Sequence, residues 1–263
     1  MSSPHKARKR FGQNFLHDAG VIQQILHCIQ PQAGQTLVEI GPGQGALTRG
    51  LLQQCGQLIA IELDRDLIAP LQRQTSNLGQ LQIIQQDVLT VDFNPLALPH
   101  QKLRIVGNLP YNISTPLLFH LFDFMPRLED IHVMLQKEVV ERMAAAPGNK
   151  IYGRLSVMMQ YHCQVIPLLL IKPQSFSPAP SVDSMLVRLI PHHSPPVAID
   201  SLANFQQVVS HAFSQRRKTL GNALQNLISR EQIKSQSIDP SLRAEQLDLA
   251  AFARLSQLLP PLP

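Results

Sequence analysis

Acidic side chains and glycines recur along residues 36–87 at spacings that suit a small polar ligand. Glu39 opens the run Glu39-Ile-Gly-Pro-Gly-Gln-Gly45, and Glu62 and Asp87 each follow an apolar segment. Glycines in a turn let the backbone approach a ligand closely and supply positive φ angles where these are needed. Carboxylates at such positions accept hydrogen bonds from ribose hydroxyls or from an exocyclic amine. The three acids together indicate a nucleotide-like ligand, whereas Asp87 alone is as typical of a helix N-cap.

The glycine run fits two classes of ligand. From Gly41 to Ala46 it nearly matches the Gly-x-Gly-x-x-Gly/Ala fingerprint of dinucleotide-binding domains, with Glu62 roughly 20 residues further on. From Glu39 to Gly45 it resembles the first motif of S-adenosylmethionine-dependent methyltransferases. In both classes Glu62 is expected to accept hydrogen bonds from the ribose. The run by itself leaves both classes open, together with a purely structural glycine turn.

A second polar group, Asn108-Leu-Pro-Tyr111, follows another apolar segment. It resembles the motif of methyltransferases that act on exocyclic amino groups of bases, in which Asn, Asp or Ser precedes two prolines and an aromatic residue. Here Leu109 replaces the first proline. Adenine N6 is a poor nucleophile, because its lone pair is delocalised into the ring. Two acceptors aimed at its hydrogens, the Asn108 side-chain oxygen and the Leu109 carbonyl, would draw N6 towards a tetrahedral shape and free that lone pair.

The other two residues of this tetrapeptide would hold the arrangement in place. Pro110 fixes its own φ and keeps Leu109 extended. Tyr111 would stack on the base, which has to leave its own stack to reach such a pocket. The sulfonium methyl of S-adenosylmethionine is already a good electrophile, so the enzyme mainly has to position the two reactants. The alternative is an ordinary strand-to-loop turn, which Glu62 and Asp87 upstream make the weaker explanation.

Apolar segments alternate with helix-like segments around these residues. The predicted strands are Thr36–Ile40, Leu58–Glu62, Leu81–Gln86 and Leu103–Val106, and the predicted helices are Ala46–Gln54 and Asp64–Gln74. Such alternation predicts a doubly wound parallel sheet. Ligands of open α/β sheets lie outside the carboxyl ends of the strands, so Glu62 and Asp87 are expected to face one crevice.

The second half of the chain reads as helical after Ser114. The sequence then predicts a strand at Ile131–Gln136, a helix at Glu138–Ala146 and a strand at Met185–Ile190. The loop-like composition of residues 192–196 predicts a domain boundary. We therefore expect one domain at residues 1–194 and a second at 195–263, with helical periodicity from Leu202 onward.

The composition of the 263-residue chain is typical of a folded protein with a large domain and a small one. Hydrophobic residues make up 44% and charged residues 16%, which excludes disorder as the dominant state. The apolar run Val165–Ile171 is far shorter than the roughly 20 residues needed to span a bilayer. The three cysteines show no zinc-ligand spacing, and no secretory signal is recognised. We expect a reduced, cytoplasmic protein without a metal.

Positive charge is concentrated at both ends of the chain. Residues 195–263 carry seven basic and five acidic residues, and Arg216, Arg217 and Lys218 are consecutive. Residues 1–10 contain no acid and four basic residues, namely Lys6, Arg8, Lys9 and Arg10. Basic ends suit a polyanionic partner, because each neutralised phosphate releases a counterion. A solubilising tail and a solvated helix face explain these charges equally well.

Six segments spread over nearly the whole length resemble one enzyme family, the ribosomal RNA small-subunit adenosine dimethyltransferases. This family converts two adjacent adenosines near the end of small-subunit rRNA to N6,N6-dimethyladenosine. The segments are Lys9-Arg-Phe-Gly-Gln-Asn-Phe-Leu16, Glu39-Ile-Gly-Pro-Gly-Gln-Gly45, Ala60-Ile-Glu-Leu-Asp64, Gly107-Asn-Leu-Pro-Tyr-Asn-Ile-Ser114, Phe176-Ser-Pro-Ala-Pro-Ser-Val-Asp-Ser184 and Phe213-Ser-Gln-Arg-Arg-Lys-Thr-Leu220.

The resemblance implies a Rossmann-like class I methyltransferase domain, with a mostly parallel seven-stranded sheet whose last strand is antiparallel, and a small all-α C-terminal domain. S-adenosylmethionine is the implied cofactor. Asn14 and Leu16 would close over its methionine and ribose end, and Phe176 would hold the flipped adenine against Tyr111. Periodicity alone favours a loop anchor at Phe176. The implied partner is small-subunit rRNA within a pre-ribosomal particle. The sequence does not show an oligomeric state, and a monomer is the default expectation.

The expected site residues follow from these arguments. Cofactor binding is expected of Asn14, Leu16, Gly41, Gly43, Gly45, Glu62, Asp87 and Asn108. Catalysis is expected of Asn108, Leu109, Pro110, Tyr111 and Phe176. RNA binding is expected of Lys6, Arg8, Lys9, Arg10, Arg216, Arg217 and Lys218.

Three alternative functions stay open at this point. A large-subunit rRNA adenine methyltransferase of the macrolide-resistance type would share the sheet and the Asn-Leu-Pro-Tyr logic, although the segments at 176–184 and 213–220 favour the small-subunit family. A nicotinamide-dependent dehydrogenase would use the same glycine turn and give Asn108 to Tyr111 no role. A non-catalytic ribosome-assembly factor would bind through its basic ends, although Glu62, Asp87 and Asn108 argue against a vestigial pocket.

Overall fold

A computed structural model describes residues 13–260, and its contacts divide the chain into two compact units. The first unit comprises Met1–Val140 and Ile166–Pro191, and the second comprises Glu141–Val165 and His192–Pro263. The contacts thus group residues 141–165 with the C-terminal helices, whereas the sequence division places them in the first domain. The division into functional domains at residues 194 and 195 stays a prediction.

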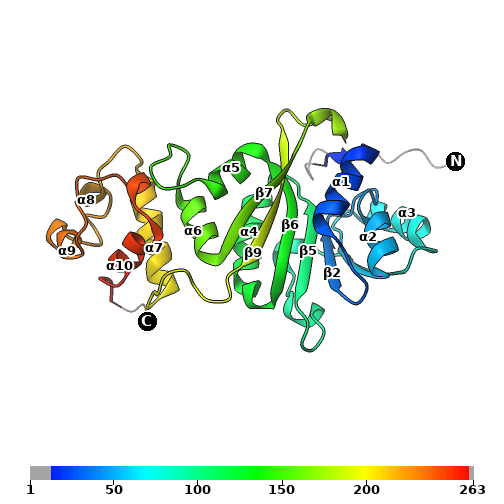
Figure 1. The fold of residues 1–263 in the computed structure, drawn as a ribbon, viewed down its shortest axis with the longest axis horizontal. Coiled ribbons are helices and arrows are strands. Elements are labelled where there is room, and N and C mark those ends of the chain that lie inside the picture. Colours follow the sequence, from blue (N-terminus) through cyan, green and yellow to red (C-terminus); the bar gives the residue numbers. More distant parts are fainter. Residues whose placement is uncertain (1–12, 261–263) are drawn as a thin grey trace. The chain divides into compact units, whose positions relative to one another are not determined.

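A seven-stranded sheet runs through the first unit, in the order β4-β3-β2-β5-β6-β9-β7. Figure 1 shows β2, β5, β6 and β9 side by side. The strands are β2 (Thr36–Ile40), β3 (Gln57–Ile61), β4 (Gln80–Ile84), β5 (Leu103–Asn108), β6 (Leu128–Gln136), β7 (Cys163–Ile171) and β9 (Ser184–Pro191). Strands β2 to β6 pair in parallel, and β9 pairs antiparallel with β6. The expected α/β fold with an antiparallel last strand is confirmed.

Helices of the first unit connect these strands. They are α1 (Ala19–Ile29), α2 (Thr48–Cys55), α3 (Arg65–Thr75) and α4 (Ser114–Leu121). Helix α5 (Lys137–Ala144) follows β6 and contains the division between the two units. Helix α1 begins where Asp18 accepts from the N–H groups of Gly20 and Val21, and α3 begins at the N-cap Asp64. Apolar side chains of α1, α2 and the sheet, such as Ile25, Leu51 and Val106, are fully buried together. This core fixes the strand ends that carry the predicted site.

Several elements of the structure are not predicted by the sequence pattern. Helix α1 has a buried apolar face, but its Gly20 and its position before the first strand weakened the signal. Strand β7 contains Pro167, which reads as a break. Because β7 lies at the edge of the sheet, the missing N–H of a proline is tolerated there. Helix α6 (Arg154–His162) was also not predicted.

The second unit is helical, as the periodicity from Leu202 onward predicts. It contains α6, α7 (Leu202–Ser214), α8 (Leu220–Ala223), α9 (Arg230–Ser235) and α10 (Leu249–Ser256). Helix α7 packs against α6, α8 and α10. Its core holds aromatic pairs, with the ring of Phe213 5.7 Å from that of Phe252 and 6.0 Å from that of Tyr152. A small hydrophobic core of its own therefore stabilises this unit.

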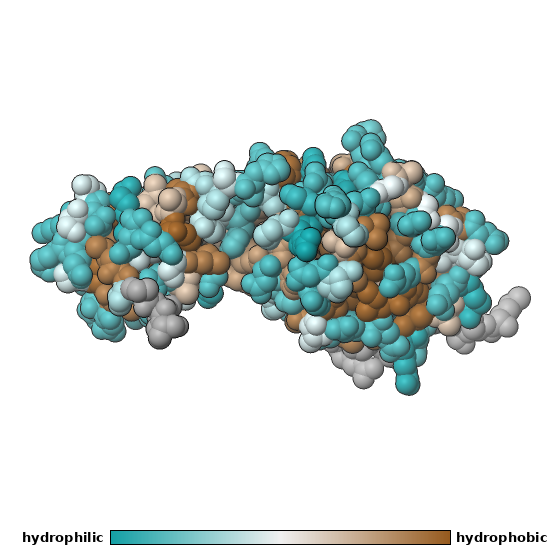
Figure 2. Space-filling model, turned by 90° about the horizontal axis from the view of Figure 1, so that it is seen from below, coloured by the Kyte–Doolittle hydropathy of each residue, from teal (hydrophilic) through white to brown (hydrophobic). Residues whose placement is uncertain are grey.

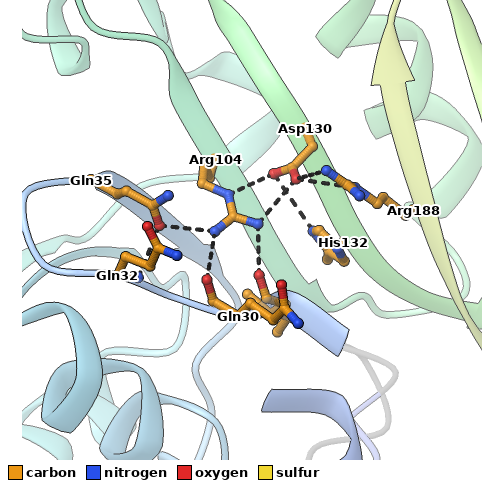
Figure 3. A network of polar contacts seen from close by, with 8 residues as sticks. Gln30, Gln32, Gln35, Arg104, Asp130, His132 and Arg188 are labelled. Atoms are coloured by element: carbon orange, nitrogen blue, oxygen red, sulfur yellow. Dashed lines mark hydrogen bonds and ion pairs between the residues drawn. The ribbon is translucent and has the colours of Figure 1, made fainter. Parts of the chain in front are cut away.

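A buried polar network ties α1 to the sheet through Arg104 at the beginning of β5 (Figure 3). Its Nε and Nη2 donate to the two carboxylate oxygens of Asp130 at 2.9 and 3.0 Å. The guanidinium also donates to the carbonyls of Ile29 and Gln30 at the C-terminal end of α1. Burial alone would raise the pKa of Asp130, but contacts with His132 and Arg104 outweigh it and hold the pKa well below its usual range.

Replacing Arg104 by methionine should strongly destabilise the protein. Arg104→Met removes the bidentate partner of the buried Asp130 carboxylate, which keeps its contact with Arg188, and it also removes the bonds to α1. Because Arg188 still compensates part of the charge, the loss should be up to roughly 3 kcal/mol, the lower end of the range for a broken buried ion pair. Urea denaturation gives the free energy of unfolding. The control is Arg65→Met, whose 3.6 Å ion pair with Asp66 is exposed and should contribute no more than about 1 kcal/mol. Equal losses in the two variants would show that the network does not anchor α1.

Candidate active site

A cavity opens at the carboxyl ends of the central strands. Its walls come from the segment Gln13–Leu16 and from the residues that follow β2, β3, β4 and β5. Seven of the eight expected cofactor-binding residues line it: Asn14, Leu16, Gly41, Gly43, Glu62, Asp87 and Asn108. Leu109, Pro110 and Tyr111 line it as well. The topology thus brings together residues that are up to 97 positions apart in the chain.

The glycine loop and Glu62 form one hydrogen-bonded floor of this cavity. The Glu62 carboxylate accepts from the N–H of Gly43 at 3.1 Å and from the N–H of Asp64 at 2.8 Å. Gly43 has a φ of 56°, and a Cβ there would lie 3.1 Å from the ring of Phe15. Burial raises the pKa of Glu62, although these N–H groups favour its ionised form. A carboxylate has about four acceptor sites, so Glu62 retains capacity to bind ribose hydroxyls.

Gly45 is the one expected cofactor-binding residue that does not line the described cavity. Its φ is 83°, and a Cβ there would lie 2.8 Å from a methyl group of Leu71 in α3. Gly45 therefore lets the loop turn against α3, and a role in contacting the cofactor stays a prediction.

Glu39 is a buried carboxyl beside the cavity. It is 2% exposed, and among the described residues its Oε2 has no hydrogen-bond partner. Burial, together with the nearby charge of Glu62, raises its pKa to about 8. An unpartnered oxygen of a buried carboxyl and a glycine cradle in one cavity fit a ligand that carries several polar groups, such as S-adenosylmethionine.

Asp87 lies at the cavity and is also the N-cap of a short helix. It lines the cavity, and its Oδ1 accepts from the N–H of Leu89 at 3.0 Å as the N-cap of the short 3₁₀ helix Val88–Thr90. One side-chain oxygen therefore fixes the local backbone. Asp87 is exposed, so its carboxylate also has access to a ligand in the cavity.

The side-chain amide of Asn108, at the end of β5, has a fixed orientation. Its Nδ2 donates to the backbone carbonyl of Asn14 at 2.8 Å. Asn14 belongs to a segment that is itself anchored, because Gln13 donates to Asp64 at 3.1 Å and β1 (Phe15–Leu16) pairs with β8 (Phe176–Ser177). With Nδ2 bound in this way, the amide presents its oxygen as the acceptor.

The backbone after Asn108 is equally constrained. The N–H of Leu109 donates to the carbonyl of Met134 on β6, and Leu109 is 1% exposed. Ser114 Oγ donates to the carbonyl of Pro110 at 3.0 Å. Tyr111 is half-buried, and its hydroxyl lies 2.7 Å from the hydroxyl of Ser184 on β9. Ser184 does not line the cavity, and no sequence pattern indicates its contact with Tyr111.

Phe176 lies in the hydrophobic core rather than on the cavity wall. It is 3% exposed, its backbone pairs with Leu16, and it is not among the residues that line the described cavity. This placement matches the loop-anchor expectation from periodicity. Its role as a second aromatic against the adenine stays a prediction.

The basic residues expected to bind RNA fall into three groups. Lys6, Arg8, Lys9 and Arg10 lie outside the described residues. Arg217 and Lys218 are exposed after α7. Arg216 is exposed as well, and it also donates to the carbonyls of Lys150 and Tyr152 and lies 3.6 Å from Glu245, so it holds segments of the second unit together. Its role in RNA binding stays a prediction.

Neither a membrane span nor a metal centre is found in the described part of the chain. Across residues 13–260, no helix is long and apolar enough to cross a membrane. The same residues contain no group of three or more side chains placed to hold a metal ion.

The fold and the site together define an S-adenosylmethionine-dependent methyltransferase. Residues 4–260 match the family described as ribosomal RNA adenine dimethylase, and the chain belongs to that family. This membership decides between the two ligand classes that the glycine loop left open.

Curated relatives and solved structures agree with this assignment. The ribosomal RNA small subunit methyltransferase A of Pseudomonas aeruginosa is 55% identical over 98% of this chain and 97% of its own length. The protein of the same name from Nitrosococcus oceani is 54% identical over 96% of both chains. A dimethyladenosine transferase from Plasmodium falciparum superposes with a TM-score of 0.76 at 25% identity, covering 92% of this chain and 95% of that one. The 23S rRNA methyltransferase ErmE shares the fold, with a TM-score of 0.73 at 22% identity over 94% of this chain and 99% of its own.

The raised pKa of Glu39 predicts a pH-dependent stability. Between about pH 4.5 and pH 8 the unfolded chain loses this proton while the folded protein keeps it. The free energy of unfolding should therefore fall as pH rises through this window, by about 1.4 kcal/mol for each pH unit crossed. Glu39→Gln keeps the shape without the titration and should flatten the profile.

Chemical denaturation between pH 5 and pH 8 checks this prediction. Glu129→Gln, which removes an exposed carboxylate on β6, serves as the control and should follow the parent protein. A Glu39→Gln profile with the same slope as the parent protein would show that Glu39 is already ionised in the folded state.

Proposed function

We propose that this methyltransferase dimethylates N6 of two adjacent adenosines near the 3′ end of small-subunit rRNA, with S-adenosylmethionine as the methyl donor. The observation that carries the proposal is the fixed Asn108 amide, whose oxygen is presented as an acceptor at the cavity. Family membership and the names of the relatives, which are small-subunit methyltransferases, support the choice of substrate.

Asn108 and Leu109 prepare the amine for transfer. The Asn108 oxygen and the Leu109 carbonyl accept the two N6 hydrogens, so the lone pair is turned out of the ring plane. Pro110 restrains the chain at this point, and the bond from Leu109 N–H to Met134 fixes the peptide. Because these acceptors are already in place, little reorganisation is needed when the base arrives.

The cavity residues account for the methyl donor. When bound, S-adenosylmethionine supplies an electrophilic methyl group. Glu62 and Asp87 offer acceptors for its ribose and adenine, Gly41 and Gly43 allow the close approach of the backbone, and Asn14 and Leu16 cover its methionine end. Tyr111 receives the target adenine by stacking, after that base has left its own stack.

The proposal also includes the form in which the rRNA is bound and the compartment in which the protein acts. The substrate is a pre-ribosomal small subunit, gripped by the basic N-terminal arm and by residues 195–263. The protein acts in the cytoplasm as a monomer and needs no metal. The exposed pair Arg217 and Lys218 supports the RNA-binding role of the helical region.

Transfer of labelled methyl to small subunits that lack adenosine dimethylation tests the proposal. Label recovered as N6,N6-dimethyladenosine near the 3′ end of the small-subunit RNA is the expected result. Label in large-subunit RNA, or no label despite cofactor binding, would overturn the assignment of substrate.

Two substitutions separate catalysis from cofactor binding. Asn108→Ala should lower the rate of methyl transfer at least about 100-fold, because one acceptor in a prearranged site is lost. Cofactor affinity should at most be reduced, through the lost bond to Asn14. Glu62→Ala should weaken cofactor binding roughly tenfold or more, since it removes charged hydrogen bonds from the glycine loop. Calorimetry with S-adenosylhomocysteine and initial rates measure the two effects. Near-normal turnover by Asn108→Ala would refute the acceptor mechanism.

The salt dependence of RNA binding tests the charged surface of the helical unit. Replacing Arg217 and Lys218 by alanine should reduce the slope of log K against log salt by roughly 0.7–0.9 for each phosphate that is no longer neutralised. The matched control replaces Lys102 and Arg127, two exposed cations that immediately precede β5 and β6. They lie at the amino ends of these strands, whereas the cavity is at the carboxyl ends. Equal slopes for the two double variants would indicate a non-specific effect of net charge.

A further inference from the structure

We propose that Ser184 is a positioning residue that fixes the ring of Tyr111 for stacking on the target adenine. This inference rests on the proposed function and adds to it a residue outside the Asn-Leu-Pro-Tyr segment. The hydroxyl oxygens of Tyr111 and Ser184 lie 2.7 Å apart, and the two residues are 73 positions apart in the chain. Ser184 itself is 1% exposed, so its hydroxyl faces Tyr111 and not solvent.

Ser184 has a position that the sheet determines. It is the first residue of β9 and pairs with Gln136 on β6. The carbonyl of the preceding residue, Asp183, accepts from the N–H of Lys137 at 2.9 Å, and the Asp183 carboxylate accepts from Lys172 at 2.9 Å. The serine hydroxyl is therefore carried by rigid sheet backbone, and only one torsion is free to move it.

Tyr111 needs such a partner because of where it lies. It follows Pro110 and precedes α4, on a segment that belongs to no helix or strand. Its backbone is restrained by Pro110, but the ring could still rotate about two side-chain torsions. The bond to Ser184 holds the far end of the ring as well. Burial raises the pKa of Tyr111, so its hydroxyl stays protonated and able to take part in this bond at neutral pH.

A ring held at both ends presents one face to the cavity before the base arrives. Stacking then orders the adenine without first ordering the tyrosine. The base enters with its N6 directed at the acceptors of Asn108 and Leu109, and small errors in this orientation reduce the rate strongly. Breaking the bond to Ser184 should consequently act on the chemical step more than on substrate binding.

A double-mutant cycle with methyl transfer to unmethylated small subunits tests the inference. Ser184→Ala and Tyr111→Phe break the same bond from its two sides, and Tyr111→Phe keeps the aromatic ring. Each should lower kcat roughly tenfold, while KM for the subunit and affinity for S-adenosylhomocysteine change less than about twofold. The double variant should be no slower than the slower single variant, because both substitutions remove one and the same bond.

Ser256→Ala is the control for the loss of a buried hydroxyl. Ser256 is 2% exposed and bonds to Ala253 within α10, so its removal should leave kcat unchanged. Should Ser184→Ala fail to fold, the kcat of Tyr111→Phe relative to the parent protein decides the question alone.

The outcomes separate this inference from the function on which it rests. An active parent protein with a near-normal kcat in either single variant, or with multiplicative losses in the double variant, overturns the role of Ser184 and leaves the function standing. A parent protein that transfers no methyl to small subunits overturns both.

Discussion

The hydrogen bond from the Asn108 amide to the Asn14 carbonyl is the interaction on which the site depends. An amide can donate from one end and accept at the other, and rotation by half a turn would direct its NH₂ group at the target amine. The bond to Asn14 removes that ambiguity. It also joins Gln13–Leu16, which lines the cavity, to the residue that we propose receives the base. In this proposal, binding of the methyl donor and orientation of the acceptor amine share one structural element.

The two ends of the parallel strands carry different kinds of residues. At their carboxyl ends the loops carry Glu62, Asp87 and Asn108 into one cavity. At the amino end of β5, Arg104 and Asp130 tie α1 to the sheet, and a charged pair is buried there because every donor of the guanidinium is used. Apolar side chains come together on one face of the first unit, among hydrophilic ones (Figure 2). The residues that stabilise the fold and the residues of the candidate site therefore lie at opposite ends of the parallel strands.

The sequence predicts the parts of this structure that depend on local pattern. The strand–glycine–helix order identifies the sheet, and the acids at strand ends indicate the crevice, because parallel strands bring such positions together whatever their spacing. Contacts between segments that are distant in the chain cannot be predicted from local pattern. Nothing near Ser184 in the chain shows that its hydroxyl meets Tyr111, since only the β6–β9 pairing brings it there. Arg216 reads as a surface cation like its two neighbours, and nothing in the sequence shows that it also donates to backbone carbonyls of the second unit. Gly45 fits a motif, although its tight neighbour is Leu71.

A crystal structure of the protein with S-adenosylhomocysteine and an RNA that presents the target adenosine would test directly whether Asn108 and Leu109 accept the hydrogens of N6. We expect an adenine stacked on Tyr111, with N6 at about 2.7–3.2 Å from both the Asn108 side-chain oxygen and the Leu109 carbonyl. The Asn108 Nδ2 should still donate to Asn14. An adenine bound elsewhere in the cavity, or an Asn108 amide turned so that its nitrogen faces N6, would contradict the mechanism.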